Sequence, residues 1–279
     1  MEHSVGWLGA LVYGLLQGLT EFLPVSSSAH IRIMGALVPG WGDPGAAFTA
    51  VIQLGTETAV VVYFRKEIWA IIRTWTAALF KPSLRRHPDA RMGWYIIAGT
   101  LPIGILGFLF KDVIETALRS LVYVGCSLIG FGIILGIADA IARNRKSLTQ
   151  LNLPEAMVFG FAQALALIPG VSRSGGTITA GLLMGYTREA AAKYSFLLAI
   201  PAVFASGLFE VLKIGDEGSP DWGPTILATL VSFGVGYMVI VYFMRYISQR
   251  DFRPFVVYRA LLGAGVLALL AFGVVTAYA

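Results

Sequence analysis

Six long apolar segments limit this chain to folds that cross a membrane. They cover residues 45–64, 92–110, 121–142, 188–213, 224–247 and 255–277. Each is close to the roughly 20 residues that a helix needs to cross the hydrocarbon core of a bilayer. Of the 279 residues, 57% are hydrophobic and only 13% are charged, and a soluble domain of this size needs more charge on its surface. We therefore expect an all-α polytopic membrane protein.

The distribution of charge excludes one class of function and predicts an orientation. The net charge of +5 is no evidence for nucleic-acid binding, because the basic residues lie in connections between apolar segments. Thirteen of the 21 Lys and Arg residues fall in three connections: seven in 65–91, three in 143–146 and three in 245–253. The positive-inside rule places these connections in the cytoplasm and both termini outside. The opposite side carries Lys111, Arg119, Lys213, Asp216, Glu217 and Asp221.

Two further apolar segments, 6–38 and 155–186, are interrupted in the middle. The interruptions cover residues 24–30 and 169–177, which are rich in Ser, Gly or Pro. Each divides its segment into halves too short to cross the bilayer, so we expect a helix–loop–helix that enters the membrane and returns on the same side. The segment 67–80, which contains two Trp residues, is expected to be a helix at the membrane surface.

The interrupted segments belong to an internal repeat with an offset of 146 residues. Without gaps, Gln17 coincides with Gln163, and the Ser-x-Ser pair that starts at Ser26 coincides with the pair that starts at Ser172. We expect one membrane domain over 1–279, with repeat 1 at about 6–142 and repeat 2 at about 155–277. Each repeat would hold one re-entrant helix–loop–helix and three transmembrane helices. Because three spans separate the re-entrant segments, the topology is inverted, and both loops would face one cavity near the bilayer midplane.

The two loops carry complementary chemistry. The candidates in and beside the first loop are Glu21, Ser26, Ser27, Ser28 and His30, and those of the second are Ser172, Arg173, Ser174, Gly175 and Thr177. An Arg, several hydroxyls and two helix N-termini with free N–H groups make a site for a phosphate. Glycines let the backbone close around such an anion. A carboxylate and an imidazole beside the phosphate favour hydrolysis.

Simpler explanations exist for each of these residues. A Ser after Pro is often only a helix N-cap, a lone Arg often reaches from the loop to the membrane surface, and a lone His often lies satisfied in a core. Hydrogen bonds between helices explain the polar residues within the spans, Gln53, Glu57 and Asp139, as readily as catalysis does. The functional interpretation rests on the coincidence of two complementary loops at equivalent positions of the repeat.

At these residues the chain resembles the BacA-type undecaprenyl-pyrophosphate phosphatases. The segment from Gln17 to His30 resembles the family's (Glu/Gln)-xxx-Glu signature and the Ser-rich loop after it. The segment from Pro169 to Gly175 resembles the family's Pro-Gly-x-Ser-Arg-Ser-Gly signature. The likeness extends over essentially the whole chain in motif order, spacing and hydropathy.

The resemblance implies an enzyme of the bacterial cell membrane that removes the terminal phosphate from undecaprenyl (C55 isoprenyl) diphosphate. The product is the monophosphate carrier for peptidoglycan and other envelope polymers. It also implies a site open to the outer side, a divalent metal (Mg²⁺ or Ca²⁺) and a link to bacitracin, which sequesters the same lipid. Whether the protein forms a homodimer stays open.

The resemblance assigns catalysis to Glu21, Ser27, His30 and Arg173, with Glu21 also as a metal ligand. Gln17 and the remaining Ser and Thr residues would support them. Many members carry Glu where this chain has Gln17, and Gln cannot act as a base and is a poor metal ligand.

Two reaction routes and two other functions stay open at this point. The nucleophile is either the Ser27 hydroxyl, activated by His30, or a metal-bound water with Glu21 as the base. The main alternative function is a flippase for a polyprenyl phosphate lipid, because inverted repeats around a midplane site are common in transporters. An intramembrane Ser/His protease is weaker, because the chain has no Gly-x-Ser-x-Gly elbow.

Overall fold

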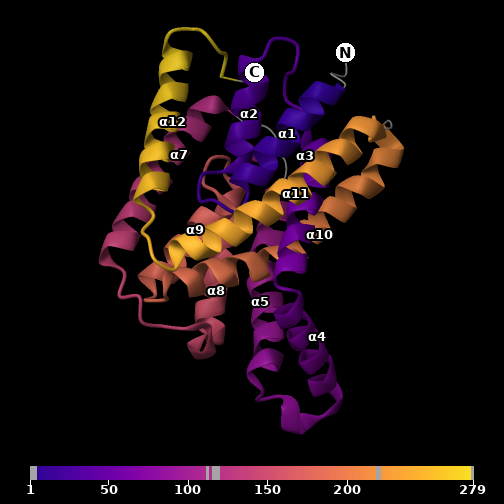
Figure 1. The fold of residues 1–279 in the computed structure, drawn as a ribbon, viewed down its shortest axis with the longest axis vertical. Coiled ribbons are helices and arrows are strands. Elements are labelled where there is room, and N and C mark those ends of the chain that lie inside the picture. Colours follow the sequence, from indigo (N-terminus) through magenta and orange to yellow (C-terminus); the bar gives the residue numbers. More distant parts are fainter. Residues whose placement is uncertain (1–4, 111–112, 115–119, 218–220, 278–279) are drawn as a thin grey trace.

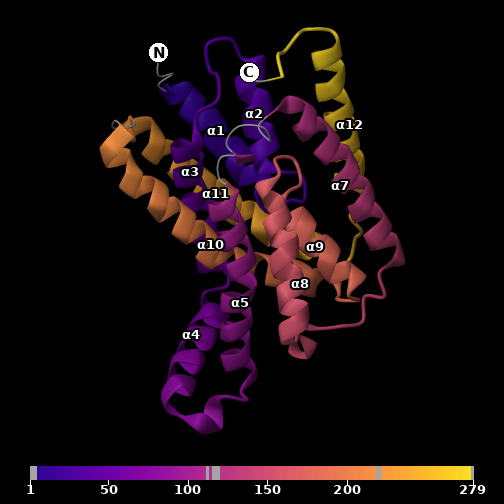
Figure 2. The same cartoon turned by 180° about the vertical axis from the view of Figure 1, so that it is seen from behind.

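The computed structural model describes residues 5–110, 113–114, 120–217 and 221–277, with the side chains of 46 and 213–217 left out. Over these ranges the chain forms helices and no β-strand (Figures 1 and 2). The expected all-helical class is therefore confirmed. Lys111 and Arg119, which the topology prediction used, lie outside the described residues, and so do the side chains of Lys213, Asp216 and Glu217.

Within the described residues, five helices are long and apolar enough to cross a membrane, judged by length and composition. They are α5 (Pro88–Leu109), α7 (Leu121–Ile141), α10 (Arg188–Glu217), α11 (Trp222–Ile247) and α12 (Arg253–Ala271). All five correspond to expected spans, although the bounds differ. The helix α5 begins four residues early because His87 caps it and Pro88 occupies its first position. The helix α12 ends early, before Gly273 at φ 69°.

The sixth expected span is a shorter helix. Helix α3 (Ala46–Tyr63) is followed by α4 (Arg65–Phe80), and the two meet at a bend of 81°. Within the described residues α3 by itself falls just short of the length of a span, and only the pair together meets the length and hydropathy of one. The expected break between 45–64 and 67–80 is confirmed, and the location of α4 at the membrane surface stays a prediction.

Both interrupted segments are pairs of short helices. The first contains α1 (Trp7–Thr20) and α2 (Ser27–Leu37); the second contains α8 (Leu153–Ala164), the 3₁₀ turn η4 (Leu165–Leu167) and α9 (Arg173–Leu183). The predicted interruptions were wrong in extent. Residues 27–30 and 173–177 form the first turns of α2 and α9, because the serines before them act as helix caps.

Close helix pairs hold these short helices in the bundle. Helix α1 packs on α11, and α8 packs on α5. A Cβ atom at Gly14 would lie 2.6 Å from the carbonyl oxygen of Ala228, and one at Gly160 would lie 2.4 Å from that of Gly99. Only glycine allows so close an approach of two helix backbones at these places.

The two pairs of short helices lie at different heights in the bundle. In both views α1 and α2 lie in the upper half, near the two ends of the chain, and α8 and α9 lie below them (Figures 1 and 2). The basic connections 65–91 and 143–146 lie at the lower end, away from those ends. The two breaks therefore meet in the interior of the bundle.

Candidate functional site

Two serine caps give the loops the same local geometry. Ser26 and Ser172 both have φ 72°, a left-handed conformation that is unfavourable for residues other than glycine. The Ser26 hydroxyl accepts a hydrogen bond from the amide of Ala29 (3.4 Å), and that of Ser172 accepts one from Gly175 (3.1 Å). The N-cap explanation is thus correct for both serines. The strained caps aim the first turns of α2 and α9 into the interior.

The second serine of each pair supports the cap and joins the loops. The hydroxyl oxygens of Ser26 and Ser28 lie 3.2 Å apart, and those of Ser172 and Ser174 lie 3.1 Å apart. Ser174 also donates a hydrogen bond to the carbonyl oxygen of Leu23 in the first loop, at 3.1 Å. Residues separated by about 150 positions therefore form one site.

Glu21 is the centre of this site. One carboxylate oxygen, Oε2, accepts hydrogen bonds from the Ser27 hydroxyl (2.5 Å) and from the Gln17 amide (2.8 Å). The other oxygen, Oε1, forms an ion pair with Arg173 Nη2 at 2.5 Å. Three predicted site residues, Glu21, Ser27 and Arg173, are thus in direct contact, and Gln17 supports them.

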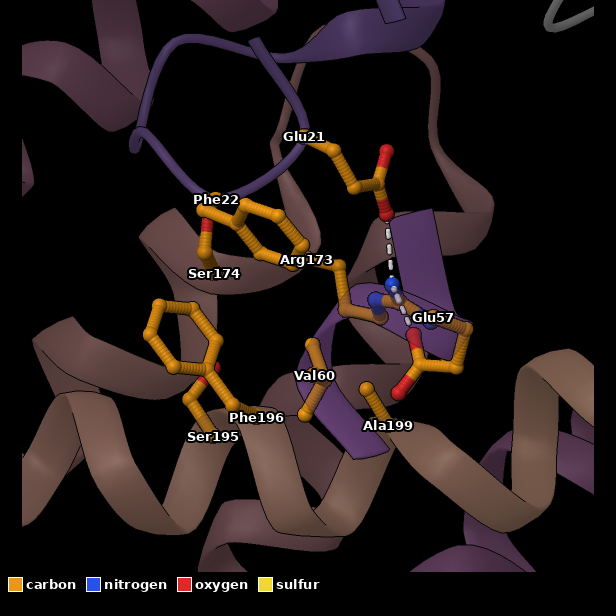
Figure 3. A pocket seen from close by; sticks show the side chains of 9 residues that line it. All are labelled: Glu21, Phe22, Glu57, Val60, Arg173, Ser174, Ser195, Phe196 and Ala199. Atoms are coloured by element: carbon orange, nitrogen blue, oxygen red, sulfur yellow. Dashed lines mark hydrogen bonds and ion pairs between the residues drawn. The ribbon is translucent and has the colours of Figure 1, made fainter. Parts of the chain in front are cut away.

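Glu57 joins the same site from helix α3. Its Oε2 atom lies 3.5 Å from Nη2 of Arg173, so Glu21 and Glu57 approach the guanidinium together (Figure 3). The Gln17 amide also donates to the Thr56 hydroxyl at 3.3 Å. Asp139, by contrast, accepts from Arg188 (2.6 Å) and from the amide of Phe252 (2.9 Å), as expected for a helix contact.

A small pocket opens beside these groups (Figure 3). Its lining residues are Glu21, Phe22, Glu57, Val60, Arg173, Ser174, Ser195, Phe196 and Ala199. One wall is charged and another is apolar, with Phe22 and Phe196 in edge-to-face contact. A pocket with one charged and one apolar wall suits a ligand with an anionic head and an apolar body.

His30 does not contact Ser27. Its Nδ1 atom lies 2.7 Å from the carbonyl oxygen of Ser26, which can only accept, so this nitrogen carries the proton. In the neutral ring, Nε2 then accepts from the Tyr258 hydroxyl at 2.6 Å, and the two rings are parallel. In this geometry Glu21, and not His30, accepts the hydrogen bond of the Ser27 hydroxyl, and activation of Ser27 by His30 stays a prediction.

Two predicted phosphate-binding residues serve the helices instead. The amide of Gly175 is used by the Ser172 cap, and a Cβ atom there would lie 2.9 Å from Nη1 of Arg259. Thr177 donates to the carbonyl oxygen of Arg173 at 2.8 Å and contacts the Ser195 hydroxyl. It is fully buried and does not line the pocket.

Arg259 is the main residue that sequence reasoning missed. It lies in α12, is fully buried, and donates only to carbonyl oxygens. These oxygens belong to Pro24, Ser127, Leu128, Gly170 and Val171, at 2.9 to 3.3 Å. The guanidinium therefore ties both loops to α7. The sequence did offer a signal for Arg259, because a charged residue within an apolar span usually has a buried partner or a function.

The oxygen atoms of the site suit a hard cation. Among the described residues no group of three or more His, Cys, Asp and Glu side chains could hold a metal. The amide oxygen of Gln17 and Oε1 of Glu57 are, however, buried and without a hydrogen-bond donor. Mg²⁺ and Ca²⁺ bind oxygen atoms, carboxylates most strongly and a side-chain amide oxygen more weakly, so two carboxylates with an amide oxygen fit the metal that the resemblance implies.

The helices and the buried site define a class: a multi-pass helical membrane protein with a charged pocket between two broken helices. Comparison with known proteins then gives the family. Residues 10–265 match the family model described as "Bacitracin resistance protein BacA". The chain therefore belongs to the BacA family, as its two motifs indicated, and it is an enzyme.

Several curated relatives share more than half of their residues with this chain. "Undecaprenyl-diphosphatase" from Nocardioides sp. is 57% identical over 274 residues, covering 98% of this chain and 100% of the relative. The protein of the same name from Paenarthrobacter aurescens is 57% identical with the same coverage. "Undecaprenyl-diphosphatase 2" from Agrobacterium fabrum is 56% identical, over 98% of this chain and 99% of the relative.

Proposed function

We propose that this chain hydrolyses undecaprenyl diphosphate to undecaprenyl phosphate and inorganic phosphate. The observation that carries the proposal is the contact of Arg173 and Ser27 with the same carboxylate, Glu21, beside a pocket with one apolar wall. The names of the curated relatives agree with it. The reaction would recycle the lipid carrier of peptidoglycan synthesis, and bacitracin resistance would follow from faster removal of the diphosphate.

The residues of the site divide the work of hydrolysis. Arg173 would leave Glu21 and bind the phosphates together with the N-termini of α2 and α9, which offset charge on the transferred phosphoryl group. Glu21 would take the proton of the Ser27 hydroxyl as the Ser27 oxygen attacks the terminal phosphorus. The bond to the bridging oxygen breaks, and undecaprenyl phosphate leaves. Water then hydrolyses the phosphoserine, which releases inorganic phosphate and restores Ser27.

A divalent metal, Mg²⁺ or Ca²⁺, would be held by Glu21 with help from the Gln17 amide oxygen. When bound, it would offset negative charge on the phosphates. His30 would act indirectly in this scheme. Its bond to the Ser26 carbonyl (2.7 Å) holds the first turn of α2, which carries Ser27.

The inverted repeat is part of the same proposal, with one membrane domain and halves at about 6–142 and 155–277. Two observations support it: the equal φ angles of Ser26 and Ser172, and the equivalent packing of α1 on α11 and of α8 on α5. We further infer a bacterial inner-membrane protein with a site open to the periplasmic side. A homodimer is compatible with these features.

The test is phosphate release from a C55 or C15 isoprenyl diphosphate by detergent-purified protein, with and without EDTA. Metal-dependent release is expected. A folded protein that releases none would contradict the proposal and favour lipid transport.

Ser27→Ala separates the two chemical routes. On the serine route we expect a loss of at least about 100-fold in kcat, and acid quenching of the wild-type reaction should trap a phosphoserine at position 27. Full activity of Ser27→Ala would exclude the serine route and leave water as the nucleophile.

A further inference from the structure

Glu57 is a fully buried carboxylate that the proposed chemistry does not use. It lies in α3, where the helix is fixed against α11: a Cβ atom at Gly55 would lie 2.3 Å from the carbonyl oxygen of Thr229. One oxygen of Glu57 lies 3.5 Å from Arg173 Nη2, and the side chain lines the pocket (Figure 3). The position of this charge is therefore set by helix packing and not by a mobile loop.

Two buried oxygen atoms, one on helix α1 and one on helix α3, have no donor among the described residues. They are Oε1 of Glu57 and Oε1 of Gln17, and both side chains have no exposed surface. A buried acceptor without a donor is unfavourable, and a buried charged acceptor is more so. The Gln17 amide nitrogen is engaged with Glu21 and with Thr56, the neighbour of Glu57. These contacts leave its oxygen as the free end of the side chain.

The balance of charge favours the binding of a cation. With both carboxyl groups ionised, Glu21 and Glu57 face one guanidinium, so the three groups leave one net negative charge beside the pocket. A diphosphate would be repelled by this charge and would find Arg173 already paired. A divalent cation bound to the carboxylates reverses the sign and frees Arg173 for the phosphates.

We propose that Glu57 is the second carboxylate of a divalent-cation site that it forms with Glu21 and the amide oxygen of Gln17. In this chain it supplies the charge that many members of the family carry as Glu at position 17. Oxygen ligands of this kind select Mg²⁺, Ca²⁺ or Mn²⁺. The inference rests on the proposed function, because it concerns the same site.

The experiment exchanges the carboxylate between the two positions and measures Mn²⁺ binding by electron paramagnetic resonance on the detergent-purified protein. Glu57→Gln keeps the shape of the side chain and should weaken Mn²⁺ binding at least about tenfold. Moving the charge, in the double variant Gln17→Glu/Glu57→Gln, should restore most of the affinity. Gln17→Glu alone should bind Mn²⁺ at least as tightly as the wild type.

Glu67→Gln is the matched control, because it removes a carboxylate of α4 that pairs with Lys193 away from the pocket. It should bind Mn²⁺ like the wild type. Phosphate release, measured in parallel, should fall in Glu57→Gln and recover in the double variant.

Unchanged Mn²⁺ affinity in Glu57→Gln would overturn the proposal and leave Glu57 as a counter-charge for Arg173. A double variant no better than Glu57→Gln, or weaker binding in Gln17→Glu, would also overturn it. If the wild type binds Mn²⁺ through Glu57 but releases no phosphate, the proposed function fails and the cation site stands.

Discussion

The two loops share the conformation of their serine caps but carry different side chains at matching positions. With the offset of 146 residues, the caps Ser26 and Ser172 coincide, and the first helical residues after them are Ser27 and Arg173. His30 coincides with Gly176. One loop thus carries the hydroxyl and the imidazole, and the other carries the cation. Two helix N-termini with similar serine caps thus present different side chains to the site.

The buried glutamines Gln17 and Gln163, which also occupy matching positions, differ in their hydrogen-bond partners. Gln17 donates to Glu21 and Thr56, whereas the positions that match these two partners in the second half carry Leu167 and Ala202. Accordingly, both side-chain polar atoms of Gln163 are buried without a partner in the described structure. Among the described residues, Gln163 thus lacks the polar partners that Gln17 has.

Of the substitutions that test the difference between the two loops, Arg173→Ala should lower activity the most. It removes the cation of the second loop, and the loss of positioning and charge stabilisation should lower kcat by at least about 100-fold. Arg173→Lys keeps the charge but not the planar fork, so it should recover only part of the rate. Phosphate release at saturating lipid measures both. Near-normal turnover of Arg173→Ala would remove the functional difference between the loops.

Arg259→Lys tests whether the two loops act as one unit. An ammonium has three donors and cannot reach all five carbonyl oxygens that Arg259 binds, so buried acceptors lose their donors. We expect a loss of about 3 kcal/mol in stability and a parallel loss of activity. Thermal unfolding in detergent gives the first quantity. A variant with wild-type stability and rate would mean that the loops are held independently.

Gln163→Met should have the smallest effect, and it should raise stability where Arg259→Lys lowers it. It removes two unpartnered polar atoms, so we expect a gain of about 1 kcal/mol in stability with unchanged phosphate release. Gln17→Met is the matched variant in the first half, and it should lower kcat about tenfold or more because Glu21 loses a positioning bond. Equal behaviour of the two variants would contradict the difference between the halves.

The sequence by itself determined the class, the spans, the broken segments and the central site residues. Apolar segments, Ser caps and the two motifs are local features, and they lead to Glu21, Ser27 and Arg173 without coordinates. The extent of the breaks was less well predicted, because Ser26 and Ser172 start their helices within the Ser-rich stretches.

Only the tertiary structure decided which partners the polar residues have. Arg259 meets carbonyl groups more than 80 residues away, His30 meets Tyr258 across 228 positions, and Glu57 meets Arg173 across 116. In the same way Gly175 makes room for Arg259, and Thr177 meets Ser195. No local pattern encodes such contacts, because they depend on how whole helices pack, and in a membrane that packing settles where each buried charge finds its partner.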